Sequence, residues 1–220
     1  MSLEVENDSE FFRLGIDLGS TTVKYVLLDP DGSVVAHAYQ RHASAVTATL
    51  ISLLRELAAS YPHLRTRVRL TGSGALTLSE RLGIGFVQEV VAAAQYLQNI
   101  SAGDSAQRPI DAAVELGGED AKILYLTGSQ ELRMNEACAG GTGAFLDQMS
   151  TALGLPLEEL NRLASLASTS HPIASRCGVF AKTDVVGLLN AGIPKSEIAR
   201  SVFDAVAEQA IGGLSCGRPL

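Results

Sequence analysis

A short sequence pattern occurs twice in this chain at a constant spacing. The segment GIDLGSTTVKYVLL begins at Gly15, and VELGGEDAKILYL begins at Val114. Three residues match at an offset of 98 positions (115 − 17): Asp17, Gly19 and Lys24 against Glu115, Gly117 and Lys122. An acid that ends a strand, a glycine turn and a returning strand predict a β-hairpin. Because chance glycines rarely keep register over a dozen positions, the repeat predicts two related lobes.

The order of strands and helices supports the same division. Strands are predicted at 11 to 18, 21 to 29, 32 to 40 and 86 to 87, and residues 67 to 74 are predicted to be a strand that runs into a glycine turn. Helices are predicted at 47 to 59 and 88 to 100, with a short helix before 86. The polar segment Ser101 to Pro109 predicts a boundary. We therefore expect a disordered leader at 1–10, a first lobe at 11–103 and a second lobe at 104–220, in an α/β fold.

The second lobe restarts the pattern of the first. Strands are predicted at 110 to 116, 121 to 127 and 130 to 136, and helices at 143 to 153, 157 to 167, 178 to 190 and 196 to 214. No closing strand is predicted before Leu220. We expect a truncated piece of a longer protein.

Composition excludes several classes of function. The net charge is −7 and no dense run of Lys and Arg occurs, which argues against a nucleic-acid groove. No run of eighteen apolar residues predicts a membrane span, and the acidic start does not resemble a secretion signal. We expect a cytoplasmic protein with no membrane partner, in which the three cysteines are reduced.

The first glycine turn is suited to phosphate. Gly19, Ser20, Thr21 and Thr22 offer N–H and hydroxyl donors after Asp17, which is expected to bind Mg²⁺ directly or through water. Lys24 would either reach a phosphate or be an ordinary solvated lysine. The alternative for the whole segment is a plain hairpin turn.

The second turn carries three carboxylates around two glycines. They lie in Glu115-Leu116-Gly117-Gly118-Glu119-Asp120. With Mg²⁺ present, Glu115 or Glu119 could orient an attacking water, and Gly117 and Gly118 could contact the nucleotide. The alternative is a solvated acidic turn.

A third glycine-rich segment leads into a predicted helix. It contains Gly140, Gly141, Thr142 and Gly143, which follow Cys138. N–H groups at the start of a helix attract anions, so this loop is expected to contact phosphate. The weaker segment at 71 to 74, TGSG, is interpreted as a structural turn.

Two cysteines precede predicted helices. Cys138 and Cys177 both occupy such positions, which favour the thiolate that metal binding needs. Together they make half of a four-cysteine iron–sulfur site, and a symmetric dimer would supply the other half. The alternative is two small structural cysteines. Cys216 is interpreted as buried or incidental, and the four histidines as solvated or satisfied in the fold.

The motifs in order resemble one family. GIDLGSTTVK, TGSG, ELGGEDAK, NEACAGGTGAFLDQM and SRCGVFAKTDVVGLLNAGIPK resemble the ATP-dependent activators of 2-hydroxyacyl-CoA dehydratases and the related benzoyl-CoA reductase ATPase subunits. The phosphate loops alone resemble the wider superfamily of actin, sugar kinases and chaperone ATPases.

The resemblance implies a specific activity. It implies a homodimer. Each subunit would have two ribonuclease H-like lobes and bind MgATP in a cleft, and the two subunits would share one [4Fe–4S] cluster. Cys138 and Cys177 of each chain would be the cluster ligands. A reduced ferredoxin or flavodoxin would supply an electron, which ATP hydrolysis would help transfer to an acyl-CoA dehydratase or reductase.

Two other classes use the same fold. One is a phosphotransferase of the sugar or acetate kinase type, and the other is a non-enzymatic, nucleotide-gated scaffold. Neither requires two thiolates at helix starts. The cysteine pair therefore favours the activator.

Overall fold

The structure, a computed structural model, describes residues 11–103, 110–128, 131–135 and 140–219. The leader predicted at 1–10 lies outside these residues. Contacts divide the chain into two compact units, Met1–Gln95 and Tyr96–Leu220. Within the described part of the chain, no helix is both long enough and apolar enough to cross a membrane.

The first unit is a five-stranded mixed sheet with helices. Its elements are β1 (Phe12–Leu18), β2 (Thr22–Leu28), β3 (Val34–Arg41), α1 (Val46–Ser60), β4 (Thr66–Thr71), α2 (Leu76–Leu82) and β5 (Gly85–Phe86). The strand order is β3-β2-β1-β4-β5. β1 pairs antiparallel with β2 and parallel with β4, so the ends of β1 and β4 lie at the same edge of the sheet. α3 (Glu89–Gly103) begins in this unit and continues into the second.

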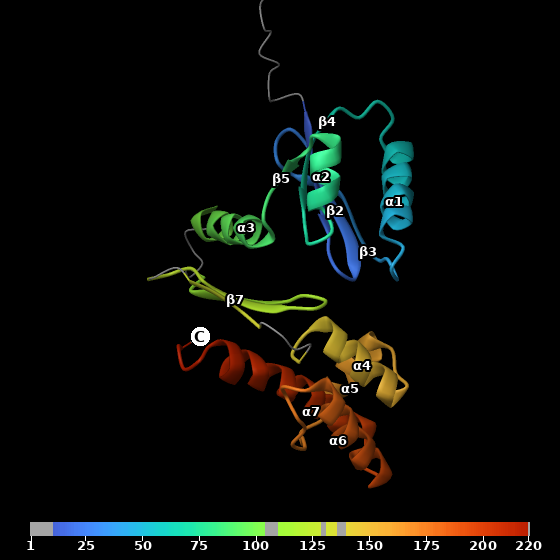
Figure 1. The fold of residues 1–220 in the computed structure, drawn as a ribbon, viewed down its shortest axis with the longest axis vertical. Helices are drawn as coiled ribbons and strands as arrows, with labels where there is room; N and C mark the ends of the chain where they lie inside the picture. The colour runs from blue at the N-terminus through green and yellow to red at the C-terminus, as the bar shows by residue number, and fades with distance from the viewer. Residues whose placement is uncertain (1–10, 104–109, 129–130, 136–139, 220) are drawn as a thin grey trace, which may run out of the picture. The chain divides into compact units, whose positions relative to one another are not determined.

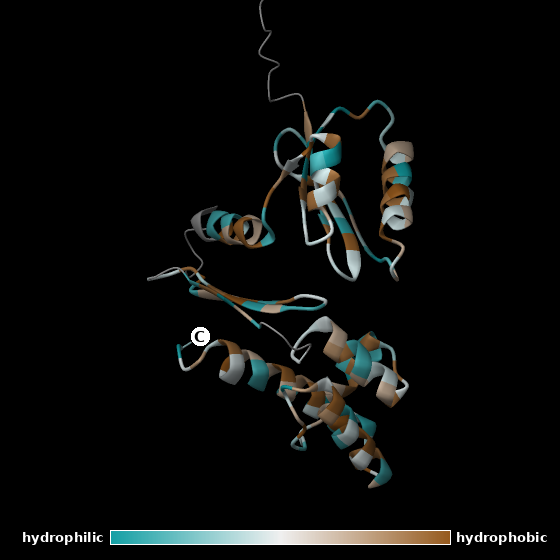
Figure 2. Cartoon of the chain, in the orientation of Figure 1, coloured by the Kyte–Doolittle hydropathy of each residue, from teal (hydrophilic) through white to brown (hydrophobic). Residues whose placement is uncertain are grey.

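Alternating side chains determine which face of this sheet is covered. Leu14, Ile16 and Leu18 of β1 are buried, whereas Arg13 and Gly15, which alternate with them, are exposed. The period of two places the leucines and isoleucine on one face. α1 lies along this part of the unit (Figure 1) and contributes an apolar stripe to the same core, visible as brown bands that alternate with teal in Figure 2. Burial of this stripe positions β1, and with it the turn that follows β1.

The second unit combines a small sheet with a helical cluster. Its strands are β6 (Ala112–Leu116), β7 (Ala121–Tyr125) and β8 (Glu131–Met134), in the order β6-β7-β8. Its helices are α4 (Gly143–Leu153), α5 (Leu157–Leu166), α6 (Gly178–Asn190) and α7 (Lys195–Glu208), followed by a π-helix (Gln209–Leu214). Phe145, Met149 and Leu160 lie in the core that these helices share.

The predicted α/β class and the predicted elements are confirmed. α4 and α6 have the expected bounds, and most other elements differ by one to three residues. The helix expected at 196–214 differs, because it ends at Glu208 and continues as the π-helix. A side-chain carbon at Gly213 would lie 2.7 Å from Nε2 of Gln209, so the Gln209 side chain packs closely on this glycine. Such π-helical turns often occur near functional sites.

Candidate functional site

The two repeated segments form the same hairpin. The N–H of Gly19 donates to the carbonyl of Thr22 at 3.0 Å, and the N–H of Gly117 donates to the carbonyl of Asp120 at 2.8 Å. Asp17 pairs with Lys24 across the first hairpin, and the second pairs the equivalent acid and lysine. Each of these matches keeps the offset seen in the sequence. The repeat is therefore structural as well as sequential.

The two carboxylate oxygens of Asp17 have different surroundings. Nζ of Lys24 donates to Oδ2 at 2.7 Å. Oδ1 is buried and has no hydrogen-bond partner among the described residues, and the same holds for Oγ1 of Thr71. Thr71 is the β4 residue opposite Asp17 in the parallel register. A buried carboxylate oxygen without a partner is costly unless a ligand or ion satisfies it.

Gly72 allows the chain to pass close to this carboxylate. Its φ is +93°, and a side-chain carbon there would lie 2.4 Å from Asp17 Oδ1. The interpretation of TGSG as a structural turn agrees with this packing. The close approach of this turn to Oδ1 therefore requires glycine at position 72.

The charge of Lys24 is stabilised in the folded protein. Burial lowers its pKa, but the hydrogen bond and the negative charge of Asp17 outweigh burial, and the pKa is raised above its ordinary value of 10.5. Lys24 is therefore protonated at neutral pH and donates to Asp17 as a cation. The lysine is first a partner of Asp17, and direct contact with phosphate stays a prediction.

A carboxylate with one oxygen held by a cation and the other without a partner suits Mg²⁺. Mg²⁺ prefers oxygen ligands and keeps part of its water shell. Oδ1 of Asp17 is such an oxygen, and the hydroxyl of Thr71 is a neutral acceptor in the neighbouring strand. The residues present therefore fit the ion that the sequence predicts.

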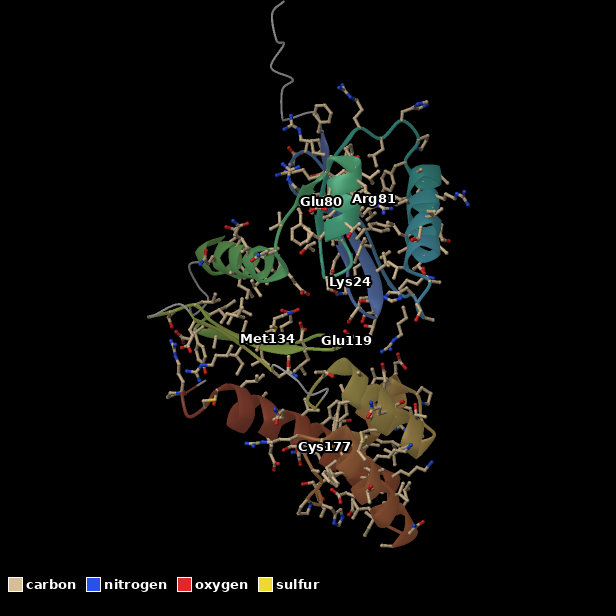
Figure 3. The ribbon with its side chains drawn as sticks, in the orientation of Figure 1. Lys24, Glu80, Arg81, Glu119, Met134 and Cys177 are labelled. Carbon is tan, nitrogen blue, oxygen red and sulfur yellow. The ribbon has the colours of Figure 1, made fainter. Side chains whose placement is uncertain are left out.

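The acidic turn surrounds a buried lysine. Lys122 is 4% exposed, and its Nζ lies 3.2 Å from Oδ1 of Asp120 and 3.6 Å from Oε1 of Glu115. Glu119 is exposed at the tip of the β6–β7 hairpin (Figure 3). Two of the three carboxylates thus neutralise Lys122, and Glu119 faces solvent. Orientation of an attacking water by Glu115 or Glu119 stays a prediction.

The glycine loop before α4 is tightly packed. The N–H groups of Gly143 and Ala144 donate to the carbonyls of Gly117 and Gly118, each at 2.8 Å. The hydroxyl of Thr142, which is fully buried, accepts from the N–H of Phe145 and caps the helix. The sequence predicts free N–H groups here, but these three are used within the protein. Phosphate contact by Gly140, Gly141, Thr142 and Gly143 stays a prediction.

Donors of the first turn are accessible to different extents. Ser20 and Thr21 are partly exposed, whereas Thr22 is buried. Because the N–H of Gly19 already closes the turn, Ser20 and Thr21 are the better placed of the predicted phosphate contacts.

The cysteines are only partly described. Cys138 lies outside the described residues. Cys177 is a free, partly exposed thiol and is the residue immediately before α6, as predicted (Figure 3). Cys216 is exposed rather than buried and has a left-handed φ of +47°. Among the described residues, no group of three or more His, Cys, Asp or Glu side chains could hold a metal ion.

The segment that follows Cys138 touches the segment that precedes Cys177. A side-chain carbon at Gly140 would lie 2.6 Å from the carbonyl oxygen of Arg176 and 2.9 Å from that of Ser175. Gly140 is two positions after Cys138 and Arg176 is adjacent to Cys177. This contact requires glycine at 140.

One residue beside the first glycine turn, His42, was not predicted from the sequence. His42 is 6% exposed, and its ring lies against the carbonyl of Gly19. His42 belongs to no motif recognised in the sequence. It follows β3 directly, and the residues after it are Ala43 and Ser44.

The fold and the repeated acidic hairpins define an actin-like ATPase, the fold of two related lobes that the sequence predicts. The structure resembles the crystal structure of (R)-2-hydroxyglutaryl-CoA dehydratase component A from Acidaminococcus fermentans, with a TM-score of 0.79, 27% identity and coverage of 96% of this chain and 80% of the other. It also shares its fold with an activator of 2-hydroxyisocaproyl-CoA dehydratase from Clostridium difficile (TM-score 0.75, 24% identity, coverage of 92% and 74%). A family model matches residues 14–215. The chain belongs to the BadF/BadG/BcrA/BcrD ATPase family.

Sequence relatives agree with this assignment. The uncharacterized protein YjiL of Escherichia coli is 32% identical over 223 residues, with coverage of 95% of this chain and 80% of the relative. The (R)-2-hydroxyglutaryl-CoA dehydratase activating ATPase of Acidaminococcus fermentans is 27% identical over 207 residues, with coverage of 91% and 76%. The resemblance inferred from the motifs is therefore confirmed.

Proposed function

We propose that the protein is an ATP-hydrolysing activator of an acyl-CoA dehydratase or reductase. It binds MgATP and hydrolyses it to ADP and phosphate. Two copies share a [4Fe–4S] cluster, which accepts one electron from ferredoxin or flavodoxin and passes it to the partner enzyme. We also propose that the protein acts in the cytoplasm, as the sequence predicts.

The observation that carries the ATPase part is the repeated hairpin. In both units an acid, a glycine and a lysine keep one spacing, and the same turn hydrogen bond closes the hairpin. Two such turns supply the backbone N–H groups and carboxylates that a polyphosphate with a cation requires. Membership of an ATPase family supports the same assignment.

Each predicted site residue has a role in this proposal. Asp17 would hold Mg²⁺ through Oδ1, the oxygen that Lys24 leaves without a partner. When bound, Mg²⁺ would neutralise charge that develops on the phosphates. Ser20 and Thr21 would orient the phosphates, and Glu115 or Glu119 would orient the attacking water.

Two observations support the iron–sulfur part. Cys177 is a free thiol at a helix start, where a thiolate is favoured. Gly140 packs on the carbonyl of Arg176, so the segments next to the two cysteines are in contact. Cys177 would be one ligand of the cluster and Cys138 the other, and a second chain would supply the remaining two.

An exposed apolar pair next to Cys177 supports the homodimer. Val179 and Phe180, in the first turn of α6, are 73% and 66% exposed. Adjacent large apolar side chains on a surface are typical of interaction sites. A second copy that covers this turn would exclude water from the cluster.

Anaerobic reconstitution followed by iron and sulfide analysis tests the electron-transfer part. One shared cluster predicts about two iron and two sulfide ions per chain. Phosphate release in the presence and absence of Mg²⁺ tests the ATPase part. Hydrolysis by a dimer that binds no iron would contradict electron transfer and favour a kinase or scaffold. A protein with iron but no hydrolysis would contradict the ATPase.

A further inference from the structure

His42 contacts the first glycine turn through two groups. Its Nε2 lies 3.3 Å from the carbonyl oxygen of Gly19. Its backbone N–H donates to the carbonyl of Thr21 at 3.2 Å. The residue follows β3 directly and is buried. It therefore contacts the turn on both sides of Ser20.

The hydrogen bonds determine which ring nitrogen carries the proton. The backbone N–H of Ser44 lies 3.1 Å from Nδ1 and donates to it. Because an N–H can only donate, Nδ1 must be an acceptor, and a neutral ring then carries its proton on Nε2. Nε2–H is thus the donor to the Gly19 carbonyl.

A strained turn places Ser44 in this position. Ala43 and Ser44 have φ values of +43° and +68°, and the N–H of Ala45 donates to the carbonyl of His42 at 2.7 Å. Two successive left-handed residues are normally Asn or Gly. Strain of this kind persists where the surrounding structure enforces it, and it is concentrated at functional sites.

The repeat supplies independent support. The equivalent of Gly19 in the second unit is Gly117, and its carbonyl accepts from the N–H of Gly143 at 2.8 Å. Both units therefore provide a donor, from outside the hairpin, to the same carbonyl of the turn. The donors themselves are unrelated, since one is an imidazole and the other is a backbone group. The shared element is the orientation of that peptide.

The Gly19–Ser20 peptide links this orientation to phosphate. A trans peptide is planar, so its C=O and the next N–H point in opposite directions. A donor that holds the Gly19 carbonyl therefore also aims the N–H of Ser20 away from His42. We propose that His42 is a positioning residue for the phosphate turn: its Nε2–H orients the Ser20 N–H toward the nucleotide. The inference rests on the proposed function.

Three variants separate the two ring nitrogens. His42→Gln keeps a donor near the ε position, His42→Asn keeps an acceptor near the δ position, and His42→Ala keeps neither. We expect MgADP affinity, measured by calorimetry on the full chain, to fall about tenfold in His42→Ala, the size of a lost supporting contact. His42→Gln should lie closer to the wild type than His42→Asn does. His37→Ala, at an exposed β3 position, is the matched control and should bind like the wild type.

Amide hydrogen exchange supplies a readout that needs no nucleotide. The amides of Ser20 to Thr22 should exchange faster in His42→Ala and His42→Asn, while the amides of β1 are unchanged. If His42→Ala does not fold, the comparison of His42→Gln with His42→Asn decides. Equal affinity and equal exchange in the Gln and Asn variants would overturn the inference while the proposed function stands. A wild type that does not bind MgADP would overturn both.

Discussion

At the scale of single residues, the two carboxylate oxygens of Asp17 have clearly different surroundings. One oxygen is occupied by Lys24 and the other is buried without a partner among the described residues. The lysine is the hydrogen-bond donor to one oxygen, and the second oxygen is the acceptor that a cation would use. The same residue is thus both a structural partner and a candidate ligand.

Asp17→Asn tests this division. The amide keeps the shape but removes the charge, so we expect Mg²⁺-dependent ATP hydrolysis to fall by roughly a hundredfold, the scale of losing one transition-state contact. Phosphate release at several Mg²⁺ concentrations is the measurement. Asp31→Asn, in an exposed turn, is the control. An unchanged rate in Asp17→Asn would exclude the metal role.

Ser44→Gly tests the strain next to His42. A left-handed φ costs an ordinary residue roughly 1–2 kcal/mol, and glycine loses about 0.5–1 kcal/mol more chain entropy than other residues on folding. We therefore expect a net gain of about 0.5–1 kcal/mol in the free energy of unfolding, measured with urea. Ser52→Gly, at an exposed position inside α1, should instead lower stability. A loss of stability in Ser44→Gly would show that the turn is not strained.

Sequence reasoning reaches only some of these residues. The pairing of Asp17 with Lys24 was predictable because a hairpin with a short turn fixes its register. The role of His42 was not predictable. The left-handed turn that follows it is formed by Ala43 and Ser44, and neither is the glycine or asparagine that normally indicates such a turn. The internal use of the Gly143 N–H was also hidden, since its partner lies more than twenty positions away.

At the scale of elements, glycines allow backbone segments to meet. Gly140 contacts the carbonyls of Ser175 and Arg176, and Gly143 contacts the acidic turn. The starts of α4 and α6 predicted from the sequence agree with the structure, and α4 has a local cap in Thr142, which accepts from the N–H of Phe145. The contacts between those helix starts are not local, and no sequence pattern indicates them.

Gly140→Ala tests the contact beside Cys177. The added carbon would lie 2.6 Å from a backbone oxygen, which cannot rotate away, so we expect a loss of about 1–3 kcal/mol of stability in urea unfolding. Gly187→Ala, inside α6 with open space around it, is the matched control and should gain up to about 1 kcal/mol. Equal stability of Gly140→Ala and the wild type would show that the two segments separate easily.

At the scale of the whole molecule, the proposal assigns two tasks to different residues. Nucleotide binding depends on the hairpins, and the cluster depends on Cys138 and Cys177. The number of lobes was predictable because the repeat is visible in sequence. The partner enzyme was not predictable, since no surface of the described residues indicates which enzyme it is.

Cys177→Ser tests this separation. We expect the variant to lose its reconstituted iron and sulfide while its MgADP affinity stays unchanged. Cys216→Ser removes an exposed thiol and should keep both properties. Parallel loss of iron and nucleotide binding in Cys177→Ser would contradict the division of tasks.

The hydrogen bonds from Gly143 and Ala144 to the acidic turn make the β6–β7 hairpin and α4 one mechanical body. A ligand that displaces the turn would pull on the start of α4 through these two hydrogen bonds, and Gly140, three residues before α4, packs closely on the carbonyls of Ser175 and Arg176. The second unit therefore contains a route from the turn to the residue next to Cys177 in which each step is a contact between main-chain segments. Side-chain rotation cannot absorb movement along such a route.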